Sequence, residues 1–381
     1  MKAPVKSSAS SSRANSIATG RPAPRANERD EGLFAQLAEH HHEQVRLYAD
    51  PAAGYRGIIA IHNTQLGPAL GGTRFWSYPS DTDALIDSLR LARGMTYKAA
   101  VAGLNLGGGK SVIIGDNKIR NREPIFRAHG RHVKALGGRY ITAEDVGTSV
   151  GDMEFIKAET DHVTGLIGKS GDPSPVTAFG VYRGIKACAK HRYGDDSLKG
   201  KTVAIQGCGH VGYYLADLLY KEGAQLYATD IDAVKLKAVV DDFRAKPVSA
   251  EEIYSVEADI FAPCALGGII NDETIPQLKV EIISGGANNQ LAEERHGDVL
   301  EEKGITYAPD YVINAGGLVN VNAELEGWTM ERARNKAGEI YDTLLMLFEL
   351  ASDEGIPSYR AADRLAEKRI AAIAKVRQNF V

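Results

Sequence analysis

The sequence predicts an α/β protein with two domains, the first built on a mixed β-sheet and the second on a parallel, doubly wound sheet. The chain has 381 residues, which exceeds the length that one hydrophobic core usually serves. From about residue 31 onward, short β-branched runs alternate with amphipathic stretches, a pattern typical of layered α/β structure. In the second half the alternation becomes regular, which favours parallel strands joined by helices.

Three β-branched runs in the first half predict strands, at residues 57–62, 110–115 and 139–144. A helix is expected over residues 82–95, because a Ser-Asp-Thr cap precedes it and Leu85, Leu89 and Ala92 fall on one helical face. These elements indicate a first, mixed domain.

Five further runs predict the strands of the second sheet, at residues 202–207, 225–230, 259–264, 281–286 and 305–310. A helix is expected over residues 336–349, with an apolar stripe that includes Ile340 and Leu344, and a further helical segment follows to Val381. Because such terminal helices can pack back across a domain boundary, we expect one domain of residues 31–170 and 345–381 and a second of residues 171–344.

Residues 1–30 are rich in Ser, Ala, Arg and Pro and contain no acidic residue before Glu28. Such a composition cannot bury enough apolar surface to fold, so we expect a disordered tail. An organelle transit peptide has a similar composition, but nothing else in the chain favours that alternative.

The composition excludes several classes of protein. Apolar residues make up 44% of the chain and charged residues 25%, with a formal net charge of −4, so nothing favours binding to nucleic acid or to an anionic membrane. No stretch approaches the roughly 18 consecutive apolar residues that span a bilayer. The three cysteines are widely spaced and form no C-x-x-C pair, which argues against a disulfide framework or a structural zinc site and favours a reducing cytoplasm.

A glycine-rich turn predicts a nucleotide site. Gly207, Gly209 and Gly212 follow a predicted strand directly and open a helix, as in the Rossmann fold, where backbone N–H groups approach a pyrophosphate. The next strand ends at Asp230, where a carboxylate can accept hydrogen bonds from the adenosine ribose and would repel a 2′-phosphate. NAD is therefore expected rather than NADP. The alternative is a purely structural turn with a solvated Asp230.

Two lysines lie twelve residues apart, and the second directly follows three glycines. Glycines contribute no side-chain packing, so three of them at 107–109 are expected where the backbone comes close to a ligand. Lys110, which follows them, can then point into a cleft. Like charges and burial both depress the pKa of a lysine, so one of the pair, Lys98 or Lys110, can serve as a base near neutral pH. For either lysine alone, a solvated surface charge is the simpler interpretation.

Eight segments together resemble the leucine/phenylalanine/valine branch of the glutamate dehydrogenase superfamily, the Glu/Leu/Phe/Val dehydrogenases. They occur in the same order and cover nearly everything after residue 38. The segments are PALGGTR (68–74), GMTYK (94–98), GGGKSVIIG (107–115), ITAEDVGT (141–148), SGDPSPVTAFGVYRGIKA (170–187), APCALGGIIN (262–271), GGANNQL (285–291) and INAGGLVNVNAEL (313–325).

The resemblance implies an NAD-dependent oxidative deamination of an apolar L-amino acid, with a first domain for substrate binding and homo-oligomer formation. Lys98 would hold the substrate α-carboxylate, Lys110 would be the general base that activates water, and Asp145 would shuttle protons to and from the amine. Thr177 would lie near the nicotinamide amide and Asn288 at the junction of cofactor and substrate. The NAD-binding residues would be Gly207, Gly209, His210, Val211, Gly212, Asp230, Thr177, Cys264, Ala265 and Asn288.

The resemblance also bears on the substrate. Glutamate-specific relatives have a lysine before the paired glycines, Gly71 and Gly72, whereas this chain has Leu70, so a substrate carboxylate would be stranded. The remaining pocket residues would be Ala143, Leu318 and Val321. Ala143 favours a branched-chain aliphatic substrate such as leucine, valine or isoleucine, whereas a leucine at 318 resembles phenylalanine and tryptophan dehydrogenases, which are the alternative.

Two other classes of protein share some features with this sequence. An NAD-binding regulatory protein that has lost the chemistry would share the fold, but such a protein has no need for both lysines and Asp145. A metal-dependent dehydrogenase is suggested only by His40, His41 and His42. Contiguous residues cannot all converge on one ion from a helix or strand, so no metal is expected.

Overall fold

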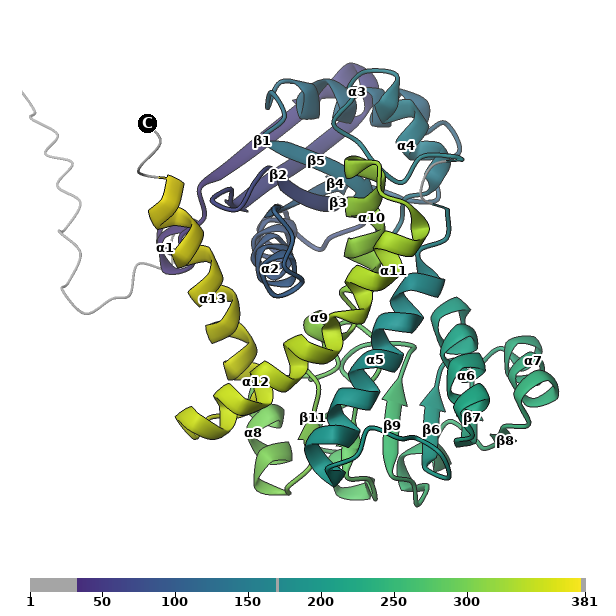
Figure 1. Cartoon of the computed structure of the whole chain (residues 1–381). Helices are drawn as coiled ribbons and strands as arrows, with labels where there is room; N and C mark the ends of the chain where they lie inside the picture. Colours follow the sequence, from purple (N-terminus) through teal and green to yellow (C-terminus); the bar gives the residue numbers. More distant parts are fainter. Residues whose placement is uncertain (1–32, 169–170, 378–381) are drawn as a thin grey trace, which may run out of the picture.

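The computed structural model describes residues 33–168 and 171–377, so the prediction for residues 1–30 lies outside the described residues. Figure 1 shows two sheets, the first in the upper half of the view and the second in the lower half, with the long helices α5, α12 and α13 around the lower half and along the left side. None of the helices in the described ranges is long and apolar enough to cross a membrane.

The first sheet is mixed and has five strands in the order β1-β2-β4-β3-β5. Its strands are β1 (Gln44–Asp50), β2 (Tyr55–Asn63), β3 (Ala69–Trp76), β4 (Gly107–Ile114) and β5 (Tyr140–Glu144). β2 is antiparallel to β1 and β4, whereas β3 is parallel to β4 and β5. The sequence did not predict β1, which is a half-exposed edge strand, or β3, whose two central glycines interrupt the β-branched pattern.

Helices cover both faces of this sheet. α2 (Asp81–Val101) packs against β2 and β4 on one face, while α3 (Glu123–Lys134) and α4 (Val150–Lys157) lie on the other, and α1 (Leu33–Glu39) precedes β1. Ser80 caps α2 by accepting a hydrogen bond from the Asp83 N–H. The helix extends six residues beyond its predicted end, because it packs closely on β4: a Cβ on Gly108 would lie 2.1 Å from the Thr96 nitrogen. This extension carries Lys98.

The second sheet has six parallel strands in the order β11-β10-β9-β6-β7-β8, the doubly wound arrangement that the sequence predicts. Its strands are β6 (Thr202–Gln206), β7 (Gln225–Thr229), β8 (Lys246–Pro247), β9 (Ile260–Pro263), β10 (Ile282–Ile283) and β11 (Thr306–Tyr307). The helices are α5 (Ser174–Tyr193), α6 (His210–Glu222), α7 (Ala233–Phe243) and α8 (Arg295–Glu302), and the short 3-10 turns are η2 (Glu252–Ser255) and η3 (Ile275–Gln277). The remaining 3-10 turn of the described residues, η1 (Pro51–Ala53), joins β1 to β2 in the first sheet.

The C-terminal part is helical. It contains α9 (Asp310–Ile313), α10 (Gly316–Glu326), α11 (Met330–Gly338), α12 (Ile340–Glu354) and α13 (Ser358–Arg377). The prediction of one helix from residue 336 is wrong at its start, because Lys336 belongs to α11 and α12 begins at Ile340. The predicted apolar stripe, including Ile340 and Leu344, is buried in the core as expected. α12 packs on α5, whereas α13 packs on both α12 and α2.

Arg369 of α13 closes the C-terminal end of α2. Its guanidinium donates hydrogen bonds to the carbonyls of Ala100 at 3.2 Å and Leu104 at 2.7 Å, and to Asn105 Oδ1 at 3.1 Å. The last carbonyls of a helix have no partner within the helix, so a cation placed there stabilises the helix end. The last helix of the chain thereby holds the helix end that carries Lys98.

We expect Arg369→Ala to lower the free energy of unfolding by about 2–3 kcal/mol, because half-buried carbonyls lose a charged donor. Denaturant unfolding followed by circular dichroism measures this. Arg364→Ala is the matched control, since Arg364 is an exposed arginine of the same helix, and it should change the stability by less than about 0.5 kcal/mol. Equal losses in the two variants would contradict this role for Arg369.

Candidate active site

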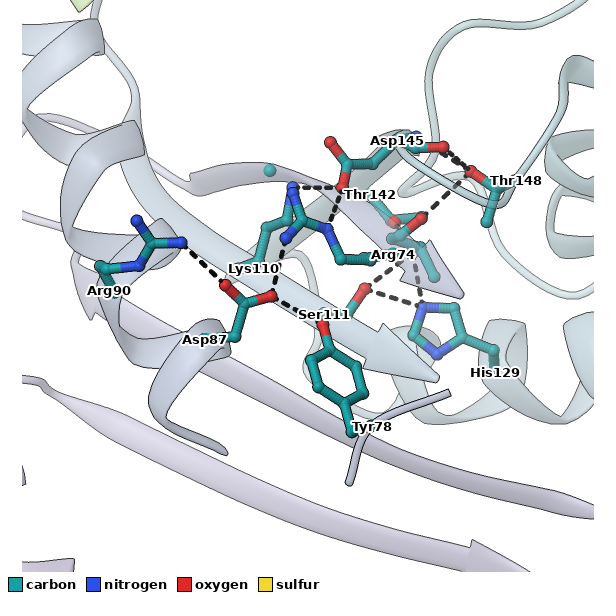
Figure 2. Close-up of polar contacts among 12 residues, drawn as sticks. Arg74, Tyr78, Asp87, Arg90, Lys110, Ser111, His129, Thr142, Asp145 and Thr148 are labelled. Carbon is teal, nitrogen blue, oxygen red and sulfur yellow. Dashed lines mark hydrogen bonds and ion pairs between the residues drawn. The ribbon is translucent and has the colours of Figure 1, made fainter. Parts of the chain in front are cut away.

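Lys110 and Asp145 form a buried ion pair in the first sheet. Lys110 lies on β4, its side chain is 5% exposed, and its Nζ lies 2.9 Å from Asp145 Oδ2 at the end of β5 (Figure 2). Burial lowers the pKa of Lys110, and the neighbouring carboxylate opposes this shift. Between these strands lies β3, where Gly72 makes room: a Cβ there would lie 2.8 Å from the Asp145 Cβ. The sheet thus brings together a lysine with a lowered pKa and a carboxylate.

Asp145 is held by more than Lys110. Arg74 of β3 donates from Nε to the same Oδ2 at 3.0 Å, and the Asp145 N–H donates to Thr148 Oγ1 at 2.9 Å. Burial alone would raise the pKa of Asp145, but Lys110 and Arg74 together lower it below its ordinary value. Asp145 is therefore ionised at neutral pH and can accept a proton.

The opposite face of the same strands holds a buried network of hydroxyl and imidazole groups. Thr73 Oγ1 is hydrogen-bonded to Ser111 Oγ at 2.7 Å and to His129 Nε2 at 2.9 Å, and it also contacts Thr142. Burial lowers the pKa of His129 to about 3, so this imidazole is neutral. Hydrogen bonds between β3, β4, β5 and α3 fix the strands that carry the ion pair.

Lys98 connects the two halves of the molecule. It lies near the end of α2, and its Nζ lies 3.4 Å from Oδ1 of Asn288, which follows β10 of the second sheet. Burial lowers the pKa of Lys98 to about 8, while Asp310 opposes the shift and Lys110 adds to it. Lys98 therefore keeps most of its positive charge at neutral pH, and burial also lowers the pKa of its neighbour Lys110.

Asn288 belongs to a polar cluster on the second sheet. Its Oδ1 also accepts a hydrogen bond from Asn314 Nδ2 at 2.7 Å, and Asn314 Oδ1 is buried without a partner among the described residues. Asp310 accepts hydrogen bonds from the N–H groups of Tyr311 at 2.7 Å and Gln290 at 3.3 Å, which ties the loop after β10 to the start of α9. The unpartnered amide oxygen of Asn314 is available to a ligand.

Two residues of this site were missed by the sequence analysis. Arg74 lies inside a quoted motif, and its place two residues after Gly72 on one face of β3 could have indicated it. Asp310 ends the last predicted strand run, and the carboxyl end of a parallel strand is where ligand-facing side chains gather. Neither position was distinguishable from a solvated charge without its partners.

The structure brings three of the predicted pocket residues together. Leu70 and Leu318 are buried in one apolar cluster with Val321 packed against it, so β3 of the first sheet meets α10. Ala143 is the strand partner of Gly72 on β5 and lies one strand away. Gly71 has a structural explanation of its own, because a Cβ there would lie 1.7 Å from the Gly109 carbonyl oxygen.

A cavity of about 620 Å³ borders this site between α2 and the loops after β10 and β11. Its lining includes Tyr97, Asn289 and Asp310, the sequence neighbours or contacts of Lys98 and Asn288. Lys98, Lys110 and Asp145 are not among its lining residues, so the reactive groups lie beside the cavity and not inside it.

Thr177 lies in the first turn of α5, where its Oγ1 donates to the Pro173 carbonyl at 2.9 Å. The start of α10 packs on this turn: a Cβ on Gly316 would lie 2.6 Å from the Val176 carbonyl oxygen, and one on Gly317 would lie 3.1 Å from Thr177 Oγ1. The two glycines therefore let the helix with Leu318 approach the helix with Thr177.

The glycine-rich turn has the shape of a phosphate cradle. Gly207 has φ +100°, and a Cβ on Gly212 would lie 2.0 Å from the Gly207 carbonyl oxygen, so both glycines are required by the turn itself. Gly209, which caps α6, has no atom within 4 Å of its Cβ position and faces a cavity of about 250 Å³. A helix N-terminus with open space in front of it fits a pyrophosphate.

The surroundings of the turn also fit a dinucleotide. The Asp230 carboxylate accepts hydrogen bonds from the N–H groups of Cys208 at 2.6 Å and Asp232 at 2.7 Å. Ile231, which is 97% exposed, and Leu266, which is 75% exposed, follow the strands on either side of β6 and offer apolar surface for an adenine.

The other predicted cofactor residues lie around the same turn. His210 is the first residue of α6 and is largely exposed, with its Nδ1 3.1 Å from Asp172 Oδ2. A Cβ on Gly286 would lie 2.9 Å from Val211, so the start of α6 packs on the loop after β10. Burial raises the pKa of the Cys264 thiol to about 11, which suits a wall residue and not a nucleophile. Ala265 lies against Gly207, 2.7 Å from its Cβ position.

The histidine run does not converge on one point. His42 Nε2 is hydrogen-bonded to the Leu89 carbonyl at 3.0 Å, and the His42 ring packs edge-on against His62, 4.8 Å between ring centroids. Within residues 33–168 and 171–377, no three His, Cys, Asp or Glu side chains are arranged to hold a metal ion.

Comparison with known proteins gives one consistent result. Residues 41–162 match the family described as Glu/Leu/Phe/Val dehydrogenase, dimerisation domain, and residues 168–233 and 230–377 match Glutamate/Leucine/Phenylalanine/Valine dehydrogenase. The chain is 57% identical over 352 residues to leucine dehydrogenase of Geobacillus stearothermophilus, covering 92% of this chain and 96% of that protein. It is 48% identical over 336 residues to valine dehydrogenase of Streptomyces coelicolor, covering 87% and 92% respectively.

A solved structure of L-tryptophan dehydrogenase from Nostoc punctiforme is also similar. It superposes with a TM-score of 0.83 at 46% sequence identity, covering 90% of this chain and 99% of that one.

Two glycines of the turn should respond differently to alanine. We expect Gly212→Ala to lower Tm, because its Cβ would collide with backbone. Gly209→Ala should leave Tm unchanged and weaken NAD binding at least about tenfold, because its Cβ would occupy the space in front of the helix. Thermal unfolding and calorimetric titration with NAD measure the two effects. Unchanged NAD affinity in Gly209→Ala would contradict the placement of the pyrophosphate.

Proposed function

The chain belongs to the Glu/Leu/Phe/Val dehydrogenase family, and from this we propose that it is an NAD-dependent dehydrogenase that deaminates branched-chain aliphatic L-amino acids to 2-oxo acids and ammonia, reversibly. The leucine dehydrogenase at 57% identity over nearly the whole chain supports the reaction and the substrate class. The observation that carries the proposal is the buried pair of Lys110 and Asp145 with Lys98 beside it, because these groups can divide anchoring, base and proton-transfer work.

Lys98 is the anchor of the substrate α-carboxylate. An anchor must stay cationic, and a pKa of about 8 leaves this lysine mostly protonated at neutral pH. A bound carboxylate stabilises the ammonium further. Lys98 lies on α2, which packs on the first sheet, and it contacts Asn288, which follows β10 of the second sheet. A carboxylate held by Lys98 would therefore lie between the two sheets.

Lys110 is the general base and Asp145 the proton shuttle. Asp145 takes a proton from the substrate ammonium, so that the amine lone pair can assist departure of the α-hydride. Neutral Lys110 then removes a proton from water, which attacks the carbon of the resulting imino acid. Asp145 returns a proton to the nitrogen, and ammonia leaves as the carbonyl forms, with the hydroxyl proton of the intermediate passing back to the ionised Asp145. Burial of Lys110 favours its neutral form, as this role requires.

When bound, NAD supplies the acceptor for the α-hydride. The turn with Gly207, Gly209 and Gly212 would hold the pyrophosphate, and Asp230 would face the adenosine ribose. His210, Val211, Cys264 and Ala265 would line the same path, and Thr177 and Asn288 would orient the nicotinamide end beside the substrate.

The side-chain pocket would be apolar. Leu70, Leu318 and Val321 contribute to one cluster, with Ala143, Gly71 and Gly72 on the neighbouring strand segments. A glutamate side chain would bury its carboxylate against Leu70 without a cation, at a cost of several kcal/mol. An aliphatic side chain has no such cost.

An aromatic substrate is the second candidate. Leu318 resembles the residue of phenylalanine and tryptophan dehydrogenases, and the tryptophan dehydrogenase of Nostoc punctiforme is 46% identical. A difference of one methylene in the pocket is worth only about 1–3 kcal/mol, so Leu318 alone does not rank the two substrate classes. The higher sequence identity to leucine dehydrogenase favours an aliphatic substrate.

The chain divides into two domains with separate roles in this proposal. We place substrate binding and oligomer formation in residues 31–170 and 345–381 and cofactor binding in residues 171–344, supported by the match of residues 41–162 to a dimerisation domain. The same match supports a homo-oligomer. Free thiols at Cys188, Cys208 and Cys264 support a reducing location such as the cytoplasm.

The reaction is tested by the initial rate of NADH formation with L-leucine, isoleucine, valine, phenylalanine, tryptophan and glutamate, repeated with NADP. We expect fast turnover of the aliphatic substrates with NAD and little with glutamate, since Leu70 provides no cation. A preference for phenylalanine or tryptophan would keep the mechanism and overturn the pocket assignment. No turnover of any substrate, with NAD still bound, would favour a regulatory protein.

The base is tested by Lys110→Ala. We expect kcat to fall by about 10²–10⁴, the usual contribution of a general base, while NAD binds as before. Lys118→Ala is the control, because Lys118 is exposed on the loop after the same strand. Near-normal kcat in Lys110→Ala would remove the assignment.

A further inference from the structure

The two oxygens of Asp145 have different surroundings. Oδ2 receives both Lys110 Nζ at 2.9 Å and Arg74 Nε at 3.0 Å. Within residues 33–168 and 171–377, no donor is hydrogen-bonded to Oδ1, which points away from both cations in Figure 2. One oxygen is therefore fixed by the protein, and the other is free to meet the amine of a substrate.

Arg74 is itself fixed from behind. Its Nη1 lies 2.7 Å from Asp87 Oδ2 on α2, and the same oxygen accepts a hydrogen bond from the Tyr78 hydroxyl at 2.6 Å. Asp87 Oδ1 accepts from Arg90 Nη2 at 3.0 Å. Figure 2 shows the resulting chain, from Arg90 through Asp87 and Arg74 to the ion pair. Arg74 and Asp87 are largely buried, whereas Arg90 is 61% exposed.

The reaction creates a problem that Arg74 solves. Lys110 must enter the reaction neutral so that it can act as a base later, and a neutral Lys110 does not stabilise the negative charge that Asp145 needs when it takes the ammonium proton. Burial would then favour the protonated carboxyl, which cannot accept a proton from the substrate. A guanidinium does not lose its proton at any working pH, so its charge beside Asp145 persists through every step.

We propose that Arg74, anchored by Asp87 and Tyr78, is a positioning residue that keeps Asp145 ionised and oriented while Lys110 is neutral. This inference rests on the proposed function, because it concerns the timing of the two proton-transfer groups. The planar guanidinium reaches two carboxylates at once through Nε and Nη1, and a lysine cannot reproduce that geometry.

The test is the pH dependence of kcat/KM for L-leucine in Arg74→Gln, Arg74→Lys and Asp87→Asn. In Arg74→Gln, the acidic limb of the profile should move up by about one pH unit, and kcat should fall by about 100-fold with NAD affinity unchanged. Arg74→Lys keeps the positive charge but loses the two-nitrogen geometry of the guanidinium, so the acidic limb of its profile should lie between those of Arg74→Gln and the unsubstituted protein. Asp87→Asn should give a smaller shift, and no further loss when combined with Arg74→Gln, since Asp87 acts through Arg74.

Arg90→Gln is the matched control. Arg90 contacts the same Asp87 but does not reach Asp145, so its profile should stay unchanged. Activity that falls without movement of the acidic limb in either Arg74 variant would overturn the proposal and leave Arg74 a purely structural residue. A further loss from Asp87→Asn in the Arg74→Gln background would overturn the anchoring role.

A separate readout keeps this result independent of the reaction. Infrared titration of ¹³C-labelled aspartate carboxylates, with Asp145→Asn to assign the signal, reports the ionisation of Asp145 without substrate. Its midpoint should rise in Arg74→Gln and stay constant in Arg90→Gln. If the unsubstituted protein turns over no amino acid, the proposed function fails, and this titration still decides whether Arg74 keeps Asp145 ionised.

Discussion

The constraint on which this structure depends is the placement of two lysines and two carboxylates in surroundings that remove much of their hydration. Lys98 and Lys110 repel each other, and both lose hydration, so an isolated pair would simply lose protons. Fixed opposite charges prevent that: Asp145 lies against Lys110, and Asp310 lies behind Lys98. These carboxylates therefore oppose the loss of protons that burial favours at both lysines.

Close approach of backbone segments positions these charged groups. The strands β3 and β4 and the helix α2 approach so closely that side chains are excluded at several positions, as at Gly71 and Gly108. On the opposite face, the hydrogen-bond network around Thr73 and His129 links β3 to β4 and to α3. The helix with Lys98 is in turn closed by Arg369 from the last helix. Positions far apart in sequence thus fix Lys110 and Asp145 2.9 Å apart and place the Lys98 Nζ 3.4 Å from Asn288 Oδ1.

The sequence predicted the parts of the fold in which local pattern and tertiary environment agree. The second sheet is the example, because buried parallel strands are continuous apolar runs, and its strand order is the one expected of a Rossmann domain. The pattern failed where tertiary contacts decide. β3 is a strand despite Gly71 and Gly72, because its neighbours leave no room for side chains there. α2 continues past its predicted end at Met95 to Val101, where it packs on β4. In the site, motif resemblance indicated the lysines and Asp145. The contributions of Arg74 and Asp310 depend on distances that no linear pattern contains.

The protein itself holds the glycine-rich turn in shape, because the Asp230 carboxylate accepts hydrogen bonds from the backbone N–H groups of the turn and of the loop after β7. One oxygen accepts the Cys208 N–H and the other accepts the Asp232 N–H. Asp230, which we propose faces the adenosine ribose, thus also stabilises the turn itself. Redesigning this scaffold for NADP by removing the charge would also loosen the turn. A replacement that keeps an acceptor there, as asparagine does, separates the two roles, so cofactor preference and turn rigidity must be engineered together.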